Sequence, residues 1–207
     1  MKLKKILIIL SLLVMAVPTV KSQNVNIKTN LLYDVLLSPT LGVEVGLAPK
    51  WSMDISGTLN SWNISNRRWK QWMVQPEARY WFCQRFSGHF LALHAMGGQY
   101  NFGNFGNFEP NTPNISQYDK HLMFLGTDLG QLWNYRLQGW FAGAGVAYGY
   151  TWILDRHWSL EAEIGVGWLY TRYDKFNCVG CGKKVEEDKV HNYVGPTKAA
   201  LNIIYVF

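Results

Sequence analysis

Charged residues are scarce in this sequence: Asp, Glu, Lys and Arg make up 16% of its 207 residues, where about a quarter is usual in soluble domains. After residue 22, Lys and Arg do not cluster with interleaved aromatic residues, as they do in many nucleic-acid-binding proteins. No later segment contains the run of about 18 apolar residues that a transmembrane helix needs. These absences argue against a nucleic-acid partner and against helical membrane spans in the mature chain.

Cysteine is also rare, with three residues in the chain: Cys83, Cys178 and Cys181. The last two form a Cys-x-x-Cys motif in a charged loop, whereas the thioredoxin-like redox motif follows a strand in a βαβ pattern. A zinc site needs two further soft ligands, of which His191 supplies at most one. We predict a loop disulfide between Cys178 and Cys181, or idle thiols, over the alternative of metal or redox chemistry. We expect neither a metal nor a cofactor.

What the chain has in quantity is aromatic residues and glycine, with 10 Trp, 11 Tyr, 10 Phe and 19 Gly. Trp and Tyr are enriched where a protein meets the membrane–water interface. Together with the low charge, this composition is typical of a compact all-β domain or of a protein at a lipid boundary.

The N-terminus has the three parts of a secretory signal peptide. A basic start at residues 1–5 precedes an apolar stretch over 6–17, and Val20-Lys-Ser22 resembles a small-residue cleavage site. The apolar stretch is short for a membrane-spanning helix, so a permanent anchor is the weaker alternative. We predict a signal peptide over residues 1–22 and one mature domain over 23–207. Removal of four lysines with the signal lowers the formal net charge from +6 to +2.

Alternation of apolar and polar residues with a period of two, the pattern of β-strands, runs through the mature chain. Between Trp158 and Tyr170, one face carries large apolar residues and the other mostly Ser, Glu and Gly. Aromatic residues at both ends of such a segment are typical of the girdles of transmembrane barrels. The pattern predicts about eight strands, over residues 25–36, 40–48, 51–62, 71–82, 88–101, 137–153, 158–173 and 192–207.

Short and long connections alternate between these predicted strands, as they do in outer-membrane barrels. The predicted fold is therefore all-β: a closed antiparallel transmembrane β-barrel of about eight strands in the outer membrane, in contact with lipid and lipopolysaccharide. A soluble periplasmic β-sandwich is the alternative. The last strand alternates and ends on Tyr205 and Phe207, a pattern that resembles the signal read by the barrel assembly machinery.

Several charged residues fall on the predicted inward face of the strands. A barrel of eight strands is about filled by its own side chains, so we predict an interior polar network that plugs the lumen; a narrow ion path is the alternative. The network comprises Lys28, Glu44, Asp54, Glu77, Arg79, Glu161, Glu163 and Lys198.

The predicted loops are the other candidate functional surface. Residues 101–108 form a short repeat that contains Phe102, Phe105 and Phe108. The repeat is either a flexible loop or a surface that binds a partner protein or a glycan, because aromatic residues are enriched at interfaces. No Ser-His-acid constellation is legible, so we expect no catalytic residues and no enzymatic activity; a hydrolase at the rim is the remaining alternative.

Seven short motifs are spread over nearly all of the mature chain. They are Lys28-Thr-Asn-Leu-Leu-Tyr33, Leu41-Gly-Val-Glu44, Gln75-Pro-Glu-Ala-Arg-Tyr-Trp81, Gly88-His-Phe90, Gly97-Gly-Gln-Tyr100, Gly139-Trp-Phe-Ala-Gly-Ala-Gly145 and Glu161-Ala-Glu-Ile-Gly-Val-Gly167. Together these motifs resemble the DUF3575 family, a Bacteroidetes family of unknown function. The resemblance implies an outer-membrane barrel without established catalytic residues, and a link to the assembly or anchoring of fimbriae. The chain is thus expected to act structurally or to bind fimbrial or other surface proteins, with a narrow porin-like channel as the alternative.

Overall fold

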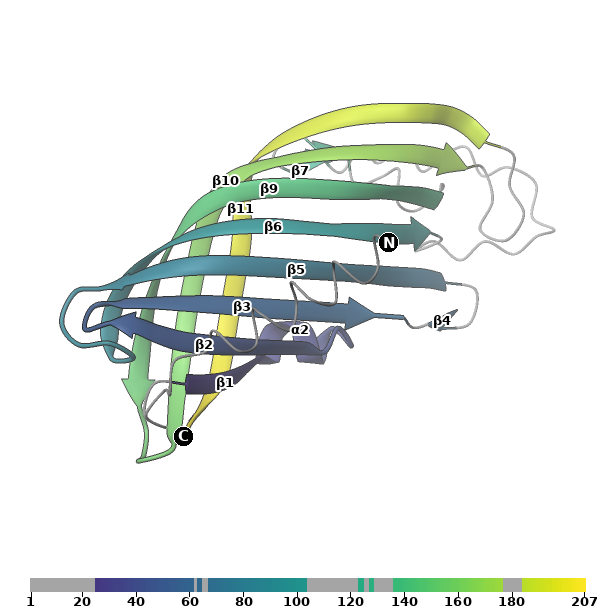
Figure 1. Cartoon of the computed structure of the whole chain (residues 1–207). Coiled ribbons are helices and arrows are strands. Elements are labelled where there is room, and N and C mark those ends of the chain that lie inside the picture. Colours follow the sequence, from purple (N-terminus) through teal and green to yellow (C-terminus); the bar gives the residue numbers. More distant parts are fainter. Residues whose placement is uncertain are drawn as a thin grey trace, which may run out of the picture.

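Eight antiparallel strands form one ring-like sheet (Figure 1). The computed structural model describes residues 25–61, 63–64, 67–103, 123–124, 127–128, 136–176 and 184–207; the predicted signal peptide lies outside them. The strands of the ring are β1 (Val25–Asn30), β2 (Thr40–Ala48), β3 (Trp51–Asn60), β5 (Arg67–Trp81), β6 (Gly88–Gly103), β9 (Arg136–Ile153), β10 (Trp158–Phe176) and β11 (Lys184–Val206). Their order around the ring is β3-β2-β1-β11-β10-β9-β6-β5. The last strand of this order, β5, also pairs with the first, β3, and this pairing closes the ring.

The remaining elements are short. Helix α2 (Leu31–Val35) connects β1 to β2, and β4 (Asn63–Ile64) pairs with the start of β5. A separate hairpin joins β7 (Met123–Phe124) to β8 (Thr127–Asp128). Within the described part of the chain, no helix is both long enough and apolar enough to cross a membrane.

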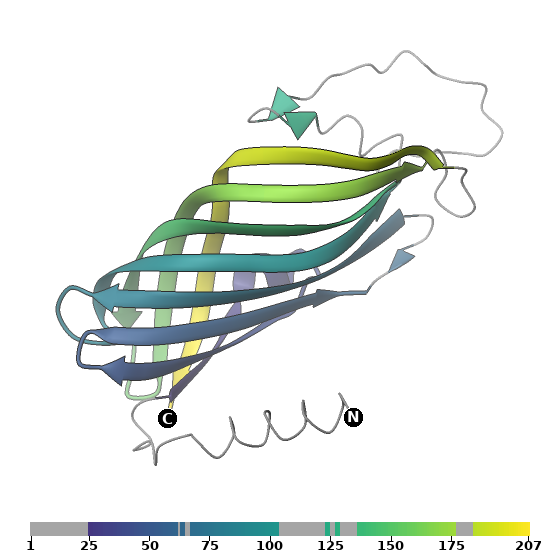
Figure 2. The same cartoon turned by 45° about the horizontal axis from the view of Figure 1, so that its top comes forward.

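The two ends of the ring differ in the length of their connections (Figure 2). At one end, here called the turn end, tight connections at residues 49–50, 82–87 and 154–157 join neighbouring strands. At the opposite end, here called the loop end, residues 104–135 separate β6 from β9, a far longer stretch of sequence than any at the turn end, and residues 177–183 separate β10 from β11. Neighbouring strands of the ring run in opposite directions, so successive connections along the chain lie at opposite ends of the ring.

The ring has a polar inside and an apolar outside. Alternate residues of each strand point to opposite faces of a sheet, and in β3 buried polar residues alternate with exposed apolar ones. The same holds in β10, where Glu161 and Glu163 are buried while Ile164 is 64% exposed. A soluble domain has the opposite arrangement, with its apolar residues inside.

The structure corrects three of the predicted strand boundaries by four residues or more. The strand expected over 71–82 begins four residues earlier, at Arg67, and ends at Trp81. The strand expected over 25–36 ends at Asn30, whose side-chain oxygen accepts a hydrogen bond from the Leu32 amide at 3.1 Å and caps helix α2. The last strand begins at Lys184 and not at residue 192. Its first residues, Lys184–His191, carry many charges and lack the clear alternation by which strands are recognised, although they pair with the end of β10.

Candidate functional site

All eight residues of the predicted interior network lie inside the ring and contact one another. They come from six strands: β1, β2, β3, β5, β10 and β11. Each is at most 7% exposed. We refer to these residues as the charge cluster: Lys28, Glu44, Asp54, Glu77, Arg79, Glu161, Glu163 and Lys198.

Arg79 is the centre of the charge cluster. Its guanidinium donates to Glu161 through Nη1 at 2.7 Å and through Nη2 at 3.1 Å, a bidentate arrangement. It also donates to Glu163 at 2.9 Å, to Glu44 at 3.2 Å and to Glu77 through Nε. Such charge-assisted bonds are the strongest that side chains make, and this one cation joins carboxylates from three strands of the ring.

Lys28 extends the cluster toward β1, β2 and β3. Its Nζ lies 3.1 Å from Glu44 and 3.2 Å from Asp54, and 3.8 Å from Glu161 on the far side of β11. Glu44 also accepts a hydrogen bond from the Ser52 hydroxyl at 2.5 Å. Lys28 therefore links four strands that are not all neighbours in the ring.

Lys198 completes the cluster on β11. Its Nζ donates to Glu77 and lies 3.0 Å from Glu163 Oε2. The other oxygen of this carboxylate, Glu163 Oε1, is buried without a hydrogen-bond partner in the described structure. His94 on β6 is also buried, and its Nε2 bonds the Thr197 hydroxyl at 3.0 Å.

The cluster contains more carboxylates than cations. Three cations face five carboxylates, so the formal charge of these eight residues is −2. Burial of charge is costly unless every group is paired, which makes the interior sensitive to the loss of any cation. No group of three or more His, Cys, Asp or Glu side chains among the described residues has the arrangement of a metal site.

Aromatic residues close the interior toward the turn end, a feature that the sequence did not single out. Trp81 and Phe90 are fully buried, with ring centroids 4.7 Å apart, and Phe86 packs against Trp81. The Trp81 indole donates to Ser52 at 2.8 Å, and the Arg79 guanidinium lies 4.5 Å from the Phe90 ring centroid. The alternation could have identified Trp81 as an inward-facing residue, because it follows Arg79 by two residues and so lies on the same face of the strand.

Asn202 is a second member of the interior that the sequence analysis omitted. Its amide donates to Glu161 Oε1 at 2.7 Å, and the Thr151 hydroxyl donates to Glu161 Oε2 at 3.2 Å. With the two bonds from Arg79, both oxygens of Glu161 are fully engaged. Asn202 lies on the inward face of the last strand, where the alternation of Leu201 and Ile203 would have placed it.

The other predicted site residues lie apart from the charge cluster. Tyr205 packs among His157, Trp158 and Phe207 at the turn end, with centroid distances of 5.6, 5.2 and 5.1 Å. Phe102 stacks on Tyr100 at the loop end. The predicted disulfide of Cys178 and Cys181, and the loop residues Phe105 and Phe108, fall outside the described residues.

Comparison with known proteins identifies a family but no characterised relative. No curated protein and no solved structure matches the chain. The model of one family, whose description is "Protein of unknown function (DUF3575)", matches residues 8–207, nearly the whole chain. The chain therefore belongs to the DUF3575 family.

Proposed function

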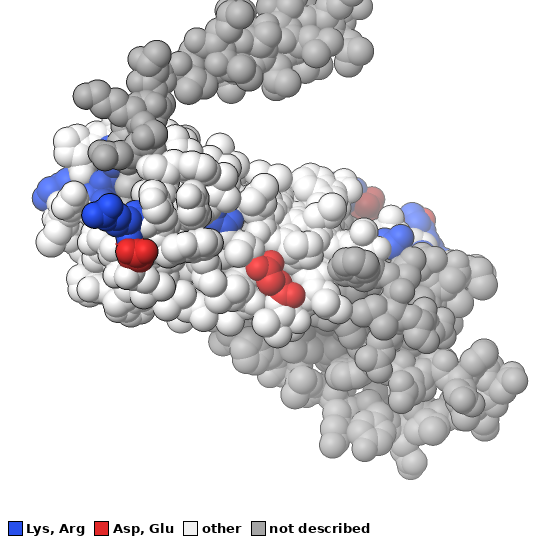
Figure 3. Space-filling model, turned by 90° about the horizontal axis from the view of Figure 1, so that it is seen from below, with Lys and Arg blue, Asp and Glu red and all other residues white. Residues whose placement is uncertain are grey.

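We propose that this protein is an outer-membrane β-barrel that acts as a structural or interaction protein at the cell surface. The observation that carries the proposal is the inverted polarity of the ring. Large apolar side chains such as Leu93 and Ile164, each 64% exposed, cover its outside, while ionised groups fill its inside. In the face drawn in Figure 3, most of the described surface is neither basic nor acidic. A lipid bilayer is the environment that such a surface fits.

The spacing of aromatic residues along β10 supports the same proposal. Trp158 lies near the turn end and Trp168 toward the loop end, and both are about half exposed. Ten residue steps at about 3.3 Å span about 33 Å along a strand, or about 25 Å across a membrane at a tilt of about 40°. This matches the apolar band of about 25 Å that separates the aromatic girdles of outer-membrane barrels.

The filled interior favours a structural or binding role over transport. The cavity beside Lys28, Asp54 and Lys198 has a volume of only about 20 Å³, about the room that a single water molecule needs. Trp81 and Phe90 lie between the charge cluster and the turn end. We expect negligible single-channel conductance in planar bilayers; a steady ohmic conductance would contradict this part of the proposal.

The proposed interaction surface is the loop end. Connections at this end of outer-membrane barrels are long and face the exterior, and the longest connections of this chain are found here. Fimbrial or other surface proteins are the partners that the family resemblance suggests. The barrel assembly machinery would insert the protein, with Tyr205 and Phe207 as the recognised C-terminus.

The first test is heat modifiability of the membrane-extracted protein on a denaturing gel. A folded outer-membrane barrel should resist the detergent and migrate differently before and after boiling. Ile164→Lys places a charge on the outer face and should lower stability in lipid vesicles by about 2–4 kcal/mol. Asp155→Lys, in an exposed turn, is the matched control and should have little effect. A periplasmic, soluble protein whose stability Ile164→Lys leaves unchanged would refute the proposal.

A further inference from the structure

A hollow of about 550 Å³ lies on the outer face of the ring, across β5, β6 and β9. Three larger residues that line it, Trp72, Val74 and Trp140, are 44%, 43% and 42% exposed. Three further lining residues alternate with the outward-facing ones along the strands and belong to the inner face: Met96, Gly98 and Phe141. At this level β6 carries only Ala95 and Gly97 on its outer face, so small residues form the floor of the hollow.

The ladder between β5 and β6 is interrupted at the hollow. Gln75 and Pro76 have no partner on β6, although the residues on either side of them are paired. Proline has no N–H to donate to a ladder, and Pro76 itself lines the hollow. An added Cβ at Gly97 would have a single neighbour within 4 Å, the Phe141 carbonyl oxygen at 3.8 Å. A proline and a glycine on neighbouring strands therefore leave open space at this place on the outer face.

A row of two tryptophans and a glutamine borders the hollow on the side of the loop end. Trp72 and Trp140 both pair with Gln99, which also lines the hollow, and directly paired residues lie on the same face of a sheet. Trp72 Nε1 donates a hydrogen bond to Gln99 Oε1 at 3.3 Å. Tryptophan is enriched where a protein crosses the membrane–water interface, so the hollow lies on the hydrocarbon side of this row.

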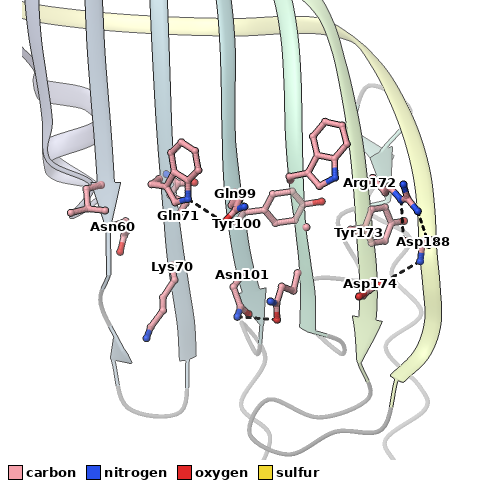
Figure 4. Close-up of a pocket in the computed structure, with 15 residues that line it drawn as sticks. Asn60, Lys70, Gln71, Gln99, Tyr100, Asn101, Arg172, Tyr173, Asp174 and Asp188 are labelled. Carbon is pink, nitrogen blue, oxygen red and sulfur yellow. Dashed lines mark hydrogen bonds and ion pairs between the residues drawn. The ribbon is translucent and has the colours of Figure 1, made fainter. Parts of the chain in front are cut away.

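A second, polar row follows toward the loop end (Figure 4). Lys70 pairs with Asn101, and Asn101 pairs with Gln138. Each of these residues lies two positions from a member of the tryptophan row on the same strand, so all three belong to the outer face. The Asn101 amide donates to Gln138 Oε1 at 3.4 Å. A molecule that fills the hollow and extends past the tryptophans would therefore reach a cation and two carboxamides.

Lys70 carries the uncompensated charge of this part of the outer face. The charged residues that continue the two rows on β10 are already paired: Arg172 Nη2 lies 2.6 Å from Asp188, and Lys184 Nζ lies 3.0 Å from Asp174. Lys70 has no acidic partner among the residues that the structure describes. It lies four residues from Val74, the partner of Gly97, or about 13 Å along the strand. A single positive charge thus lies beyond an apolar hollow, an arrangement that complements a long apolar molecule with an anionic end.

We propose that this hollow binds an acyl lipid of the surrounding membrane whose phosphate headgroup carries a net negative charge. One acyl chain lies against Ala95 and Gly97, and the phosphate accepts hydrogen bonds from Lys70 and from the Gln138 amide. The inference deepens the proposed function by naming a lipid that the barrel holds at a defined place. It rests on that function, because the outer face meets lipid only if the ring spans a bilayer.

The test uses the full mature chain folded in detergent micelles and native mass spectrometry with two lipids that have the same acyl chains. Phosphatidylglycerol is anionic, whereas phosphatidylcholine is zwitterionic. The unmodified protein should retain phosphatidylglycerol in preference to phosphatidylcholine. Gly97→Leu fills the hollow and should abolish retention of both lipids. Lys70→Gln should remove the preference but not the retention, because an exposed charge pair corresponds to at most about fivefold in affinity.

Two control variants make the same changes elsewhere. Gly57→Leu adds a leucine to the outer face of β3, where nothing lies within 4 Å of an added Cβ. Lys50→Gln removes an exposed lysine at the turn end. Both variants should retain phosphatidylglycerol with unchanged affinity and preference, so a loss confined to Gly97→Leu and Lys70→Gln assigns the lipid to the hollow.

Several outcomes would overturn the proposal. These are equal retention of the two lipids by the unmodified protein, retention that Gly97→Leu leaves unchanged, and an equal loss in Gly57→Leu. A dimer that Gly97→Leu dissociates would assign the hollow to a second copy of the chain instead. The heat-dependent gel shift is recorded on the same samples: a shift without a retained lipid rejects the hollow alone, whereas absence of the shift rejects the membrane barrel whatever the lipid result.

Discussion

Removal of the central cation should destabilise the ring more than any other single change in its interior. In Arg79→Met, a side chain of similar length replaces the guanidinium, and two lysines then face five carboxylates. Removal of one partner from a buried ion pair costs about 3–5 kcal/mol because it leaves an uncompensated buried charge. Arg79 contacts four carboxylates within 3.2 Å, so we expect a loss at the upper end of this range.

Equilibrium unfolding by urea in phospholipid vesicles, followed by tryptophan fluorescence and by the gel shift, measures this loss. Arg172→Met is the control, because the exposed pair of Arg172 and Asp188 at the loop end should matter little to stability. The double variant Arg79→Met with Glu161→Met should recover part of the loss, since an apolar pair can replace a buried ion pair. An unfolding midpoint of Arg79→Met equal to that of the unmodified protein would refute the reasoning.

Two further predictions each compare a pair of matched substitutions in the ring. Glu161→Gln should be clearly destabilising, because both oxygens of Glu161 accept bonds. Glu163→Gln should be nearly neutral, because one oxygen of Glu163 has no partner and the change reduces the negative excess; equal urea midpoints would contradict this contrast. Gly149→Ala should cost about 1–3 kcal/mol, since a Cβ there would lie 2.3 Å from the Phe90 ring. Gly57→Ala, with open space around its Cβ, should be tolerated, and a similar loss in both variants would show that the contact with Phe90 is unimportant.

The bounds of the strands were predicted best from the sequence where the two faces of a strand differ most in polarity. β2 runs from Thr40 to Ala48 as predicted, and β6, β9 and β10 differ from prediction by at most three residues at one end. Period-two alternation marks such strands because one face must be apolar and the other polar. The prediction failed at Leu31–Val35, where apolar residues are consecutive and a local cap, which alternation does not reveal, decides in favour of a helix.

In the candidate site, the sequence pattern predicted which residues face inward but not which of them contact one another. Alternation placed Glu77 and Arg79 on the inward face, but it could not say that Arg79 contacts Glu44 from another hairpin or Glu163 from the opposite part of the chain. Such contacts depend on the stagger of the strands, which fixes the level of each residue in a closed ring. Tyr100 illustrates the point again: its hydroxyl bonds Thr171 on β10, two strands away in the ring, and nothing in the local sequence of β6 specifies this contact.

The charge cluster also explains how so short a first strand can close the ring. β1 has six residues and pairs with β11 over five residue pairs, from Asn26 with Val206 to Asn30 with Asn202, and with β2 over four; these are the two shortest ladders among the described ring strands. The Asn30 side chain strengthens it by bonding the Ala199 carbonyl and the Leu201 amide. Lys28 adds contacts to carboxylates of β2, β3 and β10. Because Lys28 can make all of these contacts only when both ends of the chain are in place, the cluster couples closure of the ring to the pairing of its interior charges.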